Sequence, residues 1–431
     1  MYLEPPHYVV ITTGSAGDIY PFIRIALSVQ ALGRKVTFIT NSVHAKLVQN
    51  TGLAFVGFGT EEEYLKIIEN PDIWHPQRAV SVLFADSKDR FIEIDSVIRS
   101  TVFHNQTVIL AHPLVIASAA MVRDHGLPCK IVSVILAPFG LRTCYDPLRV
   151  GEVTVPKWVP MSWRNMFWKL VDKTLIDPSA LVQTNLARKA LGLNTIKTSY
   201  VEHIQQAPDL TVTLFPTWFG NTMPDWPRPI INAEFQLFDS VSNEGFSLEL
   251  QEFIAKGEKP LVFTPGTANL HASRFFSCAL AAVKNLSVRA IFLTKDRSQL
   301  PSELPDSVLW QSYVPLVNLL PNIKVLVHHG GIGTTAEAFR AAIPQLVTPF
   351  AWDQFDNAAR VEELGVGAVL RSSRITSRRF ENAIRALITS KEIQLRCNEI
   401  SRKLNRRLDP IELCKEIEAK LLLNNVRRKK A

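Results

Sequence analysis

Short apolar runs alternate with helix-like patterns along the first third of the chain. Residues 8–13 form a β-branched apolar run, and the glycine-rich residues 14–17 follow it directly. Such a run is typical of a strand buried on both faces of a parallel sheet. Apolar positions then recur at helical spacing over 22–32, with Pro21 at the expected first helical position and Gly33 as a C-cap. The same pattern predicts further strands at 36–40, 54–58, 108–110 and 131–134.

The alternation returns in the second half of the chain. Residues 261–264 form an apolar run that ends in Pro265-Gly266-Thr267, and further strands are predicted at 290–294, 308–311 and 325–328. Because strands that alternate with helices form doubly wound parallel sheets, the fold class is predicted to be α/β with two Rossmann-like domains. The predicted boundaries are 1–235 for the N-terminal domain, 236–405 for the C-terminal domain and 406–431 for a C-terminal helix and basic tail, with 234–245 as the linker.

Composition supports folded domains and narrows the cellular setting. The 431 residues are 47% hydrophobic and 20% charged, which is enough to build a full core in each domain. The five cysteines are scattered, which argues for a reducing compartment and against a zinc site or a disulfide framework. No signal peptide and no apolar run of about 18 residues is present, so no membrane span is expected. We predict a cytoplasmic protein, and a peripheral contact with a membrane stays open.

The charge balance favours anionic partners. The formal net charge is +8, which suits nucleotide phosphates, nucleic acid or an acidic membrane surface. No basic-aromatic motif supports nucleic-acid binding. Part of the excess lies in the tail Arg427-Arg428-Lys429-Lys430, which is interpreted as a solvated end.

Two glycine-rich turns follow apolar runs and are the candidate ligand-binding features. The first is Gly14-Ser15-Ala16-Gly17-Asp18, and the second runs from His328 to Thr335 and leads into a helical pattern. Glycine lets a backbone approach a ligand closely, and a helix N-terminus offers free N–H groups to anionic oxygens. Neither turn has the ending of a Walker A loop or the spacing of a dinucleotide fingerprint.

The second turn extends into a longer ordered motif, HGGIGTTAEAFRAAIPQLVTPFAWDQFDNA, over residues 329–358. This motif resembles the donor-binding signature of family 1 glycosyltransferases. The first turn resembles the GSxGDxxPF motif of the same family, most closely in the bacterial branch that includes the catalytic subunit of the rhamnolipid-forming rhamnosyltransferase. The resemblance covers essentially the whole chain. It implies the GT-B fold, in which two Rossmann-like domains face each other across the active site.

The resemblance also implies roles for residues around the donor diphosphate. His329 is expected to donate to the diphosphate, and Gly331 and Thr334 to supply backbone N–H groups and a hydroxyl to the same phosphates. Thr267, in the turn opposite, is expected to hold the leaving β-phosphate. No metal is then required, because preorganised donors stabilise the charge of the departing group. No cofactor is expected besides the nucleotide-sugar substrate.

The remaining donor residues are assigned by the same resemblance. Glu337 is expected to accept from the ribose hydroxyls, Tyr313 to lie over the base and Val314 to offer its backbone to the base edge. Asp353 and Gln354 are expected to bind hydroxyls of the transferred sugar. Plant members carry glutamine where this chain has Leu316, so thymine and uracil both remain open as the base.

Asp18 takes the position of the catalytic histidine of many family members. Its expected role is general base for the acceptor hydroxyl, and the alternative is a helix N-cap only. His112, which follows a predicted strand, could orient Asp18 or an acceptor, or be an ordinary loop histidine. His328 is expected to be structural.

A segment rich in tryptophan, residues 158–168, has three open interpretations. Trp158, Trp163 and Trp168 are mixed there with basic residues. The segment could be part of the core, a wall of the acceptor site or a membrane contact.

The predicted function is an inverting glycosyltransferase that moves rhamnose from dTDP-rhamnose to a hydroxy-fatty-acid acceptor. The first alternative is a UDP-glucose-dependent enzyme acting on a sterol, polyketide or other aglycone. Alternatives of other classes are a non-catalytic nucleotide-sugar-binding subunit and a nucleotide-sugar epimerase of the same fold.

Overall fold

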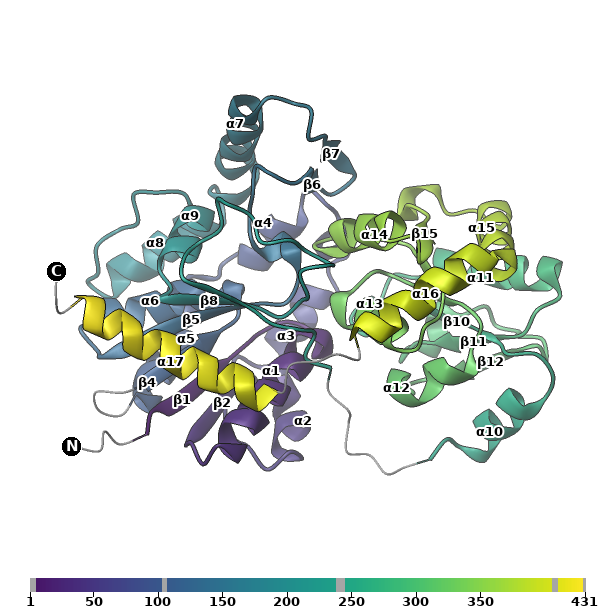
Figure 1. Ribbon diagram of the computed structural model, residues 1–431, viewed down its shortest axis with the longest axis horizontal. Coiled ribbons are helices and arrows are strands. Elements are labelled where there is room, and N and C mark those ends of the chain that lie inside the picture. Colours follow the sequence, from purple (N-terminus) through teal and green to yellow (C-terminus); the bar gives the residue numbers. More distant parts are fainter. Residues whose placement is uncertain (1–4, 103–106, 238–244, 405–409, 429–431) are drawn as a thin grey trace. The chain divides into compact units, whose positions relative to one another are not determined.

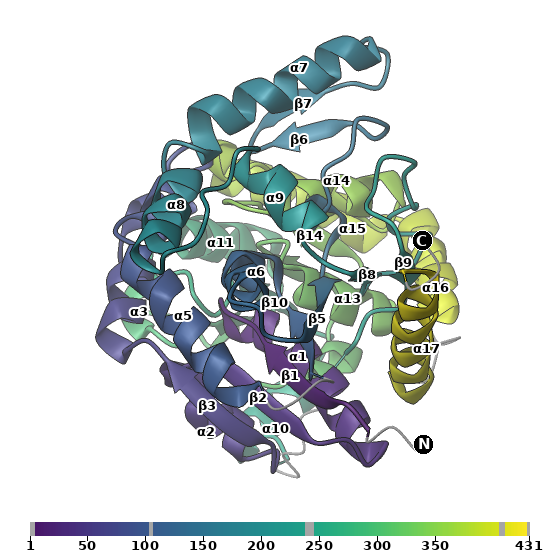
Figure 2. The ribbon, with the colours of Figure 1, turned by 90° about the vertical axis from the view of Figure 1, so that its left-hand side faces the viewer.

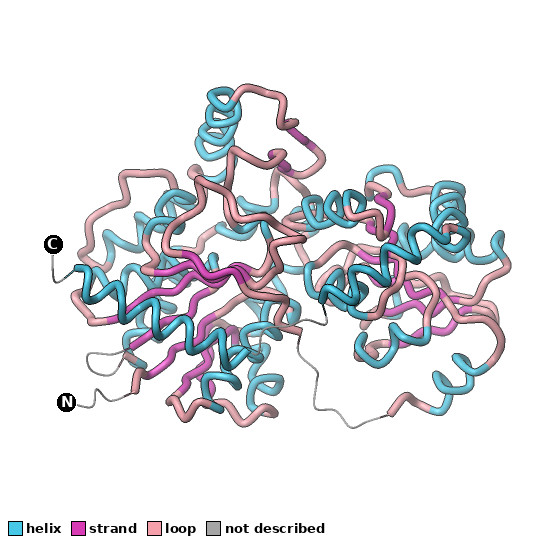
Figure 3. Tube along the Cα trace, in the orientation of Figure 1, coloured by secondary structure: helices cyan, strands magenta, loops and turns pink. Residues whose placement is uncertain are grey.

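The computed structural model describes residues 5–102, 107–237, 245–404 and 410–428, which form two compact units. The N-terminal unit comprises Met1–Arg149, Val153–Phe238 and Leu408–Ala431, and the C-terminal unit comprises Val150–Glu152 and Asp239–Arg407. Strands and helices alternate in both units, as Figure 3 shows. Most of the predicted linker and Lys429-Lys430 of the predicted tail lie outside the described residues.

The N-terminal unit is built on a seven-stranded parallel sheet. Its strand order is β3-β2-β1-β4-β5-β8-β9, and β1 lies between β2 and β4, with Val10 opposite Phe38 and Leu110. Helices α5 and α6 cover one face, where Ile94 and Ile116 pack with Val9. The strands are β1 (His7–Ile11), β2 (Val36–Asn41), β3 (Ala54–Phe58), β4 (Thr107–Ala111), β5 (Cys129–Ile135), β8 (Leu210–Thr213) and β9 (Ile230–Asn232).

Ten α-helices belong to the N-terminal unit among the described residues. They are α1 (Ala16–Ala31), α2 (Ala45–Gln49), α3 (Glu61–Ile68), α4 (Ala79–Phe84), α5 (Lys88–Thr101), α6 (Ile116–Asp124), α7 (Met161–Val171), α8 (Ala180–Ala190), α9 (Tyr200–Gln206) and α17 (Pro410–Arg428). A π-helical turn, Asp172–Ile176, follows α7. The hairpin β6 (Leu148–Val150) and β7 (Val153–Val155) precedes α7, and both lie beyond the sheet in Figures 1 and 2.

The predicted start of the first helix is wrong. We expected Pro21 in the first helical position, but α1 begins at Ala16 and Pro21 lies inside the helix. Proline lacks the N–H that would bond to the carbonyl four residues earlier, so the helix gives up one bond near its start. Ser15 and Asp18 hold the first turn instead, as described below.

The C-terminal unit is built on a six-stranded parallel sheet of order β12-β11-β10-β13-β14-β15. On one face Phe263 and Phe292 pack edge to face, and Phe275 of α11 and Phe380 of α15 join them. The strands are β10 (Leu261–Thr264), β11 (Ala290–Leu293), β12 (Val308–Gln311), β13 (Leu326–His328), β14 (Gln345–Val347) and β15 (Gly367–Val369). The helices are α10 (Leu248–Ala255), α11 (Ser273–Leu286), α12 (Leu316–Leu319), α13 (Ile332–Arg340), α14 (Gln354–Glu363), α15 (Ser377–Thr389) and α16 (Lys391–Leu404).

The prediction of two parallel α/β sheets is confirmed. Every predicted strand is present, within one to two residues at either end. Six strands were not predicted, namely β8, β9, β14 and β15 of the parallel sheets and β6 and β7 of the hairpin, because each has only three or four residues. The five cysteines are free thiols.

The last helix returns to the N-terminal unit and is held there by a partly buried carboxylate. Leu413, Cys414 and Ile417 of α17 are buried on one face of the helix. Glu418 accepts from Arg34 Nε at 2.8 Å and Nη2 at 3.0 Å, and from the Tyr8 hydroxyl at 3.1 Å. These bonds tie α17 to β1 and to the turn between α1 and β2.

Glu418→Gln is expected to lower the free energy of unfolding by about 1–2 kcal/mol, because hydrogen bonds to a charged group are lost from a partly buried site. Chemical denaturation followed by circular dichroism measures this change. Glu416→Gln is the matched control, because Glu416 lies exposed on the same helix. Equal stability of the two variants would show that the apolar face of α17 alone holds the helix.

Candidate functional site

The first glycine turn shapes a carboxylate site at the end of β1. Ser15 is the N-cap of α1, and its N–H and hydroxyl donate to Asp18 Oδ2 at 2.8 Å and 3.0 Å. Gly14 has a φ of +124°, and a Cβ there would lie 2.4 Å from the same oxygen. Asp18 is therefore the third helical residue of a capping box and not the N-cap itself. Both bonds fall on Oδ2, which leaves Oδ1 for a ligand.

Two residues that the sequence analysis missed complete the surroundings of Asp18. His44 follows β2, and its Nε2 lies 3.0 Å from the Gly14 carbonyl oxygen. The His44 ring stands edge-on to Tyr64, with 5.7 Å between the ring centroids. The pKa of Tyr64 is raised by burial and then by the negative charge of Asp18. The carboxyl ends of parallel strands meet at one edge of a sheet, which is the only signal that could have suggested this grouping.

His112 also belongs to this edge of the sheet. It follows β4, and its Nδ1 accepts from the Leu114 N–H at 3.3 Å, so the neutral ring carries its proton on Nε2. Its ring lies edge-on to Phe22 at 6.0 Å. Burial lowers the pKa of His112, and the charge of Asp18 opposes that shift. The structure thus brings a neutral imidazole near the candidate base.

In the C-terminal unit, the imidazole of His329 lies between two glycines. A Cβ at Gly331 would be 2.5 Å from His329 Nε2, and a Cβ at Gly266 would be 2.9 Å from the same atom. Burial lowers the pKa of His329 to about 4, so the ring is neutral near pH 7. Its Nδ1 is buried and has no hydrogen-bond partner among the described residues. The two glycines make the room that this ring occupies.

The second glycine turn continues into α13 from this histidine. Gly331 is the N-cap of α13, and the Thr335 hydroxyl bonds to the Gly331 carbonyl at 3.0 Å. Thr334 lies in the first turn, where helix N–H groups have no acceptor within the helix. Free N–H groups and a threonine hydroxyl beside a neutral imidazole form a suitable site for phosphate oxygens.

In the loop predicted to bind the sugar, Asp353 and Gln354 form hydrogen bonds within the loop and the start of α14. Gln354 is 4% exposed, and its Oε1 accepts from the Phe350 N–H at 2.8 Å and the Ala351 N–H at 3.1 Å. Asp353 is the N-cap of α14 and accepts from Asn357 Nδ2 at 2.8 Å. Asn357 also donates to the Gly330 carbonyl at 2.9 Å. The loop is therefore tied directly to the glycine turn.

The remaining donor residues lie at the same edge of the six-stranded sheet. Thr267 is exposed after β10, and Tyr313 is half exposed after β12. Val314 is buried in the core beside Leu319. Glu337 lies on α13 and pairs with Arg340. Thr267 and Tyr313 thus follow the ends of β10 and β12, and the two motif turns follow β13 and β14, whereas Glu337 lies inside α13.

His328 has the structural role that we expected. Its Nε2 lies 2.9 Å from Gln345 Oε1, and its Nδ1 accepts from the Gly330 N–H at 3.1 Å. Burial lowers its pKa to about 3, so it stays neutral. Gln345 was missed by the sequence analysis, because a buried glutamine in a short strand carries no local pattern.

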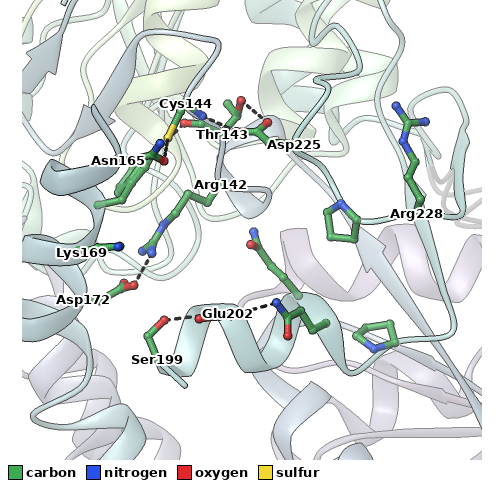
Figure 4. A pocket seen from close by; sticks show the side chains of 15 residues that line it. Arg142, Thr143, Cys144, Asn165, Lys169, Asp172, Ser199, Glu202, Asp225 and Arg228 are labelled. Carbon is green, nitrogen blue, oxygen red and sulfur yellow. Dashed lines mark hydrogen bonds and ion pairs between the residues drawn. The ribbon is translucent and has the colours of Figure 1, made fainter. Parts of the chain in front are cut away.

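A cavity of about 510 Å³ lies in the N-terminal unit, apart from the Asp18 grouping. Figure 4 shows residues of α7 and α9 on its walls. Arg142 donates to Asp172 at 2.6 Å and lies 4.5 Å above the Trp168 ring. Lys169 and Arg228 also line the cavity, and neither forms an ion pair with a described residue.

The tryptophan-rich segment is not one structural unit. Trp168 lines the cavity, and its Nε1 donates to the Thr143 carbonyl at 2.8 Å. Trp158 is 82% exposed and Trp163 is 63% exposed, so the core interpretation is wrong for both.

The described residues contain neither a membrane-spanning helix nor a metal-binding cluster. No helix among them is long and apolar enough to cross a membrane. No group of three or more of their histidine, cysteine, aspartate and glutamate side chains could hold a metal ion.

Comparisons with known proteins indicate a glycosyltransferase. The family described as "Erythromycin biosynthesis protein CIII-like, C-terminal domain" matches residues 278–420. The sterol 3-beta-glucosyltransferase of Saccharomyces cerevisiae (strain YJM789) is 26% identical over 446 residues, which cover 94% of this chain. The chain spans only 35% of the length of that relative.

Solved structures share the fold along nearly the whole chain. The glycotransferase of kitacinnamycin has a TM-score of 0.73 at 18% identity and covers 97% of this chain and 100% of its own. The spinosyn rhamnosyltransferase SpnG complexed with thymidine diphosphate has a TM-score of 0.64 at 18% identity and covers 96% and 100%. The fold of the chain is therefore GT-B.

Proposed function

We propose that this glycosyltransferase of GT-B fold transfers a sugar from a nucleoside diphosphate to a hydroxyl of a small, largely apolar acceptor. The observation that carries the proposal is the neutral imidazole of His329 between Gly266 and Gly331, beside the N-terminus of α13. Such a site presents uncharged hydrogen-bond donors to a diphosphate. Negative charge that develops on the leaving diphosphate would be stabilised there.

The acceptor would be activated by Asp18. Its Oδ1 takes the hydroxyl proton as the acceptor oxygen attacks the anomeric carbon. The bond from that carbon to the diphosphate oxygen breaks, so the anomeric configuration inverts. A modest base suffices, because the proton leaves only as the new bond forms. His112 and Tyr64, which lie near Asp18, would orient the acceptor.

The proposed donor and acceptor are UDP-glucose and a sterol- or polyketide-like aglycone. Relatives that cover nearly the whole chain are sterol glucosyltransferases, which supports this alternative over the rhamnosyl prediction. Rhamnose from dTDP-rhamnose to a hydroxy-fatty acid is the second candidate. It is supported by the GSxGD turn around Asp18 and by the thymidine diphosphate complex of a rhamnosyltransferase of the same fold.

A donor panel tests the proposal. Calorimetry without acceptor is expected to show binding of UDP-glucose at least about tenfold tighter than dTDP-rhamnose, a difference of about 1.4 kcal/mol. Transfer to a sterol should persist in excess chelator, since no metal is part of the proposed site. Tighter binding of dTDP-rhamnose would favour the second candidate. Binding of neither donor would contradict the proposed function.

A further inference from the structure

The solvent-facing side of α7 carries an apolar stripe. Trp163, Met166 and Leu170 are 63%, 58% and 57% exposed, and Trp158 just before the helix is 82% exposed. At about 100° per residue, the three helical positions fall within about 60° of one another. We propose that this stripe, Trp158 and the neighbouring lysines dock the protein on an anionic phospholipid bilayer. The proposal is independent of the sugar and of the acceptor.

Exposed apolar side chains concentrate in this part of the molecule. Seven of the thirteen large exposed hydrophobic residues among those described lie between Phe139 and Leu170. Single exposed apolar residues are ordinary, but a contiguous group marks an interaction surface. Helix α7 lies at the margin of the N-terminal unit in both views (Figures 1 and 2). Within this unit, the stripe is therefore open to a surface.

The charged residues within α7 and the segment before it are all positive. Residues 153–171 contain no aspartate or glutamate. Lys169 lies about 60° around the helix from Met166, and Lys173 follows one turn later. Both are exposed, and neither forms an ion pair with a described residue. Lysine stems can lie along apolar surface while the ammonium groups reach lipid phosphates.

A bilayer fits this surface better than a second copy or a protein partner. The stripe and Trp158 amount to four side chains, whereas a stable protein interface takes about 20–30 residues from each side. Tryptophan is enriched where membrane meets water, because its ring is apolar and its N–H is polar. A short helix with an apolar stripe beside lysines is typical of interfacial binding.

The inner side of α7 explains how the stripe is presented. Arg164 and Val171 are buried on the opposite side. Trp168 and Lys169 line the 510 Å³ cavity, so the helix is both a cavity wall and the support of the stripe (Figure 4). The packing of α7 on the N-terminal unit therefore does not depend on the apolar residues of the stripe.

Vesicle co-sedimentation tests the proposal with the full chain. Wild-type protein is expected to bind phosphatidylcholine vesicles that contain a quarter phosphatidylglycerol, and to bind pure phosphatidylcholine much more weakly. Lys169→Gln with Lys173→Gln should reduce partitioning by about fivefold per lysine, the effect of one charge near an anionic surface. Trp163→Ser, Met166→Ser and Leu170→Ser together should reduce it by at least about tenfold, because several buried methylenes are lost.

Matched controls separate docking from folding. Leu395→Ser removes an equally exposed apolar side chain from α16, and Lys256→Gln with Lys391→Gln removes two exposed charges elsewhere. These controls, and the melting temperature and donor affinity of the α7 variants, are expected to match wild type. Failure of wild type to bind the anionic vesicles would overturn the proposal. So would full binding by both α7 variants, or a wild-type dimer that the serine variant dissociates.

Discussion

Asp18→Asn is expected to lower kcat by about 100-fold or more, the usual scale for loss of a general base. Asparagine cannot take the acceptor proton at neutral pH. Its side-chain oxygen can still accept from the Ser15 N–H and hydroxyl, which bond to Asp18 Oδ2 in the wild type. The helix start should therefore survive, and single-turnover kinetics with the preferred donor measures the effect.

Two controls distinguish base loss from cap loss. Ser15→Ala removes one donor to Asp18 but keeps the carboxylate, so kcat should fall far less than in Asp18→Asn. Affinity for the nucleoside diphosphate should be unchanged in both variants, because the residues predicted to bind the nucleotide sugar lie in the C-terminal unit. Near-normal turnover of Asp18→Asn would show that Asp18 only caps α1. His112→Gln would then become the decisive variant, since His112 is the neutral imidazole beside it.

His329→Ala is expected to weaken binding of UDP and dTDP by about 1.5–3 kcal/mol, the range for a hydrogen bond to a charged group. This corresponds to a loss of affinity of about 10- to 150-fold. The imidazole is neutral in the free protein, with a pKa lowered to about 4 by burial, so it acts as a donor and not as a fixed charge. His329→Gln, which keeps a neutral donor, should retain part of the affinity.

A pair of glycine variants tests the same site by geometry. Gly331→Ala would place a Cβ 2.5 Å from His329 Nε2, whereas a Cβ at Gly333 would meet nothing within 4 Å. Gly331→Ala should therefore displace the ring and weaken diphosphate binding nearly as much as His329→Ala. Gly333→Ala should stay close to wild type. Unchanged calorimetric affinity in both His329→Ala and Gly331→Ala would remove His329 from the diphosphate site.

Local pattern was sufficient for the α/β class and for most strands of the two sheets, but it missed β8, β9, β14 and β15. The apolar runs at 8–13 and 261–264 predict buried parallel strands, because both faces of such a strand meet helices. The glycine turns after β1 and β13 predict close backbone approach, and the structure shows that Gly14 makes room for Asp18 and Gly331 for His329. The ordered motif over 329–358 indicated the enzyme class, since it holds most of the predicted donor residues along one continuous segment.

Contacts between distant segments were decided only by the tertiary structure. Glu418 bonds to Tyr8 and Arg34 across most of the chain, and His44 after β2 and Tyr64 on α3 both reach the surroundings of Asp18. Whether the tryptophans of the 158–168 segment lie inside or outside was also open, because periodicity gives the face of a helix but not what covers it. Hydrophobic period and turn chemistry act within a few residues, whereas these partners are brought together only when strands align in the sheet.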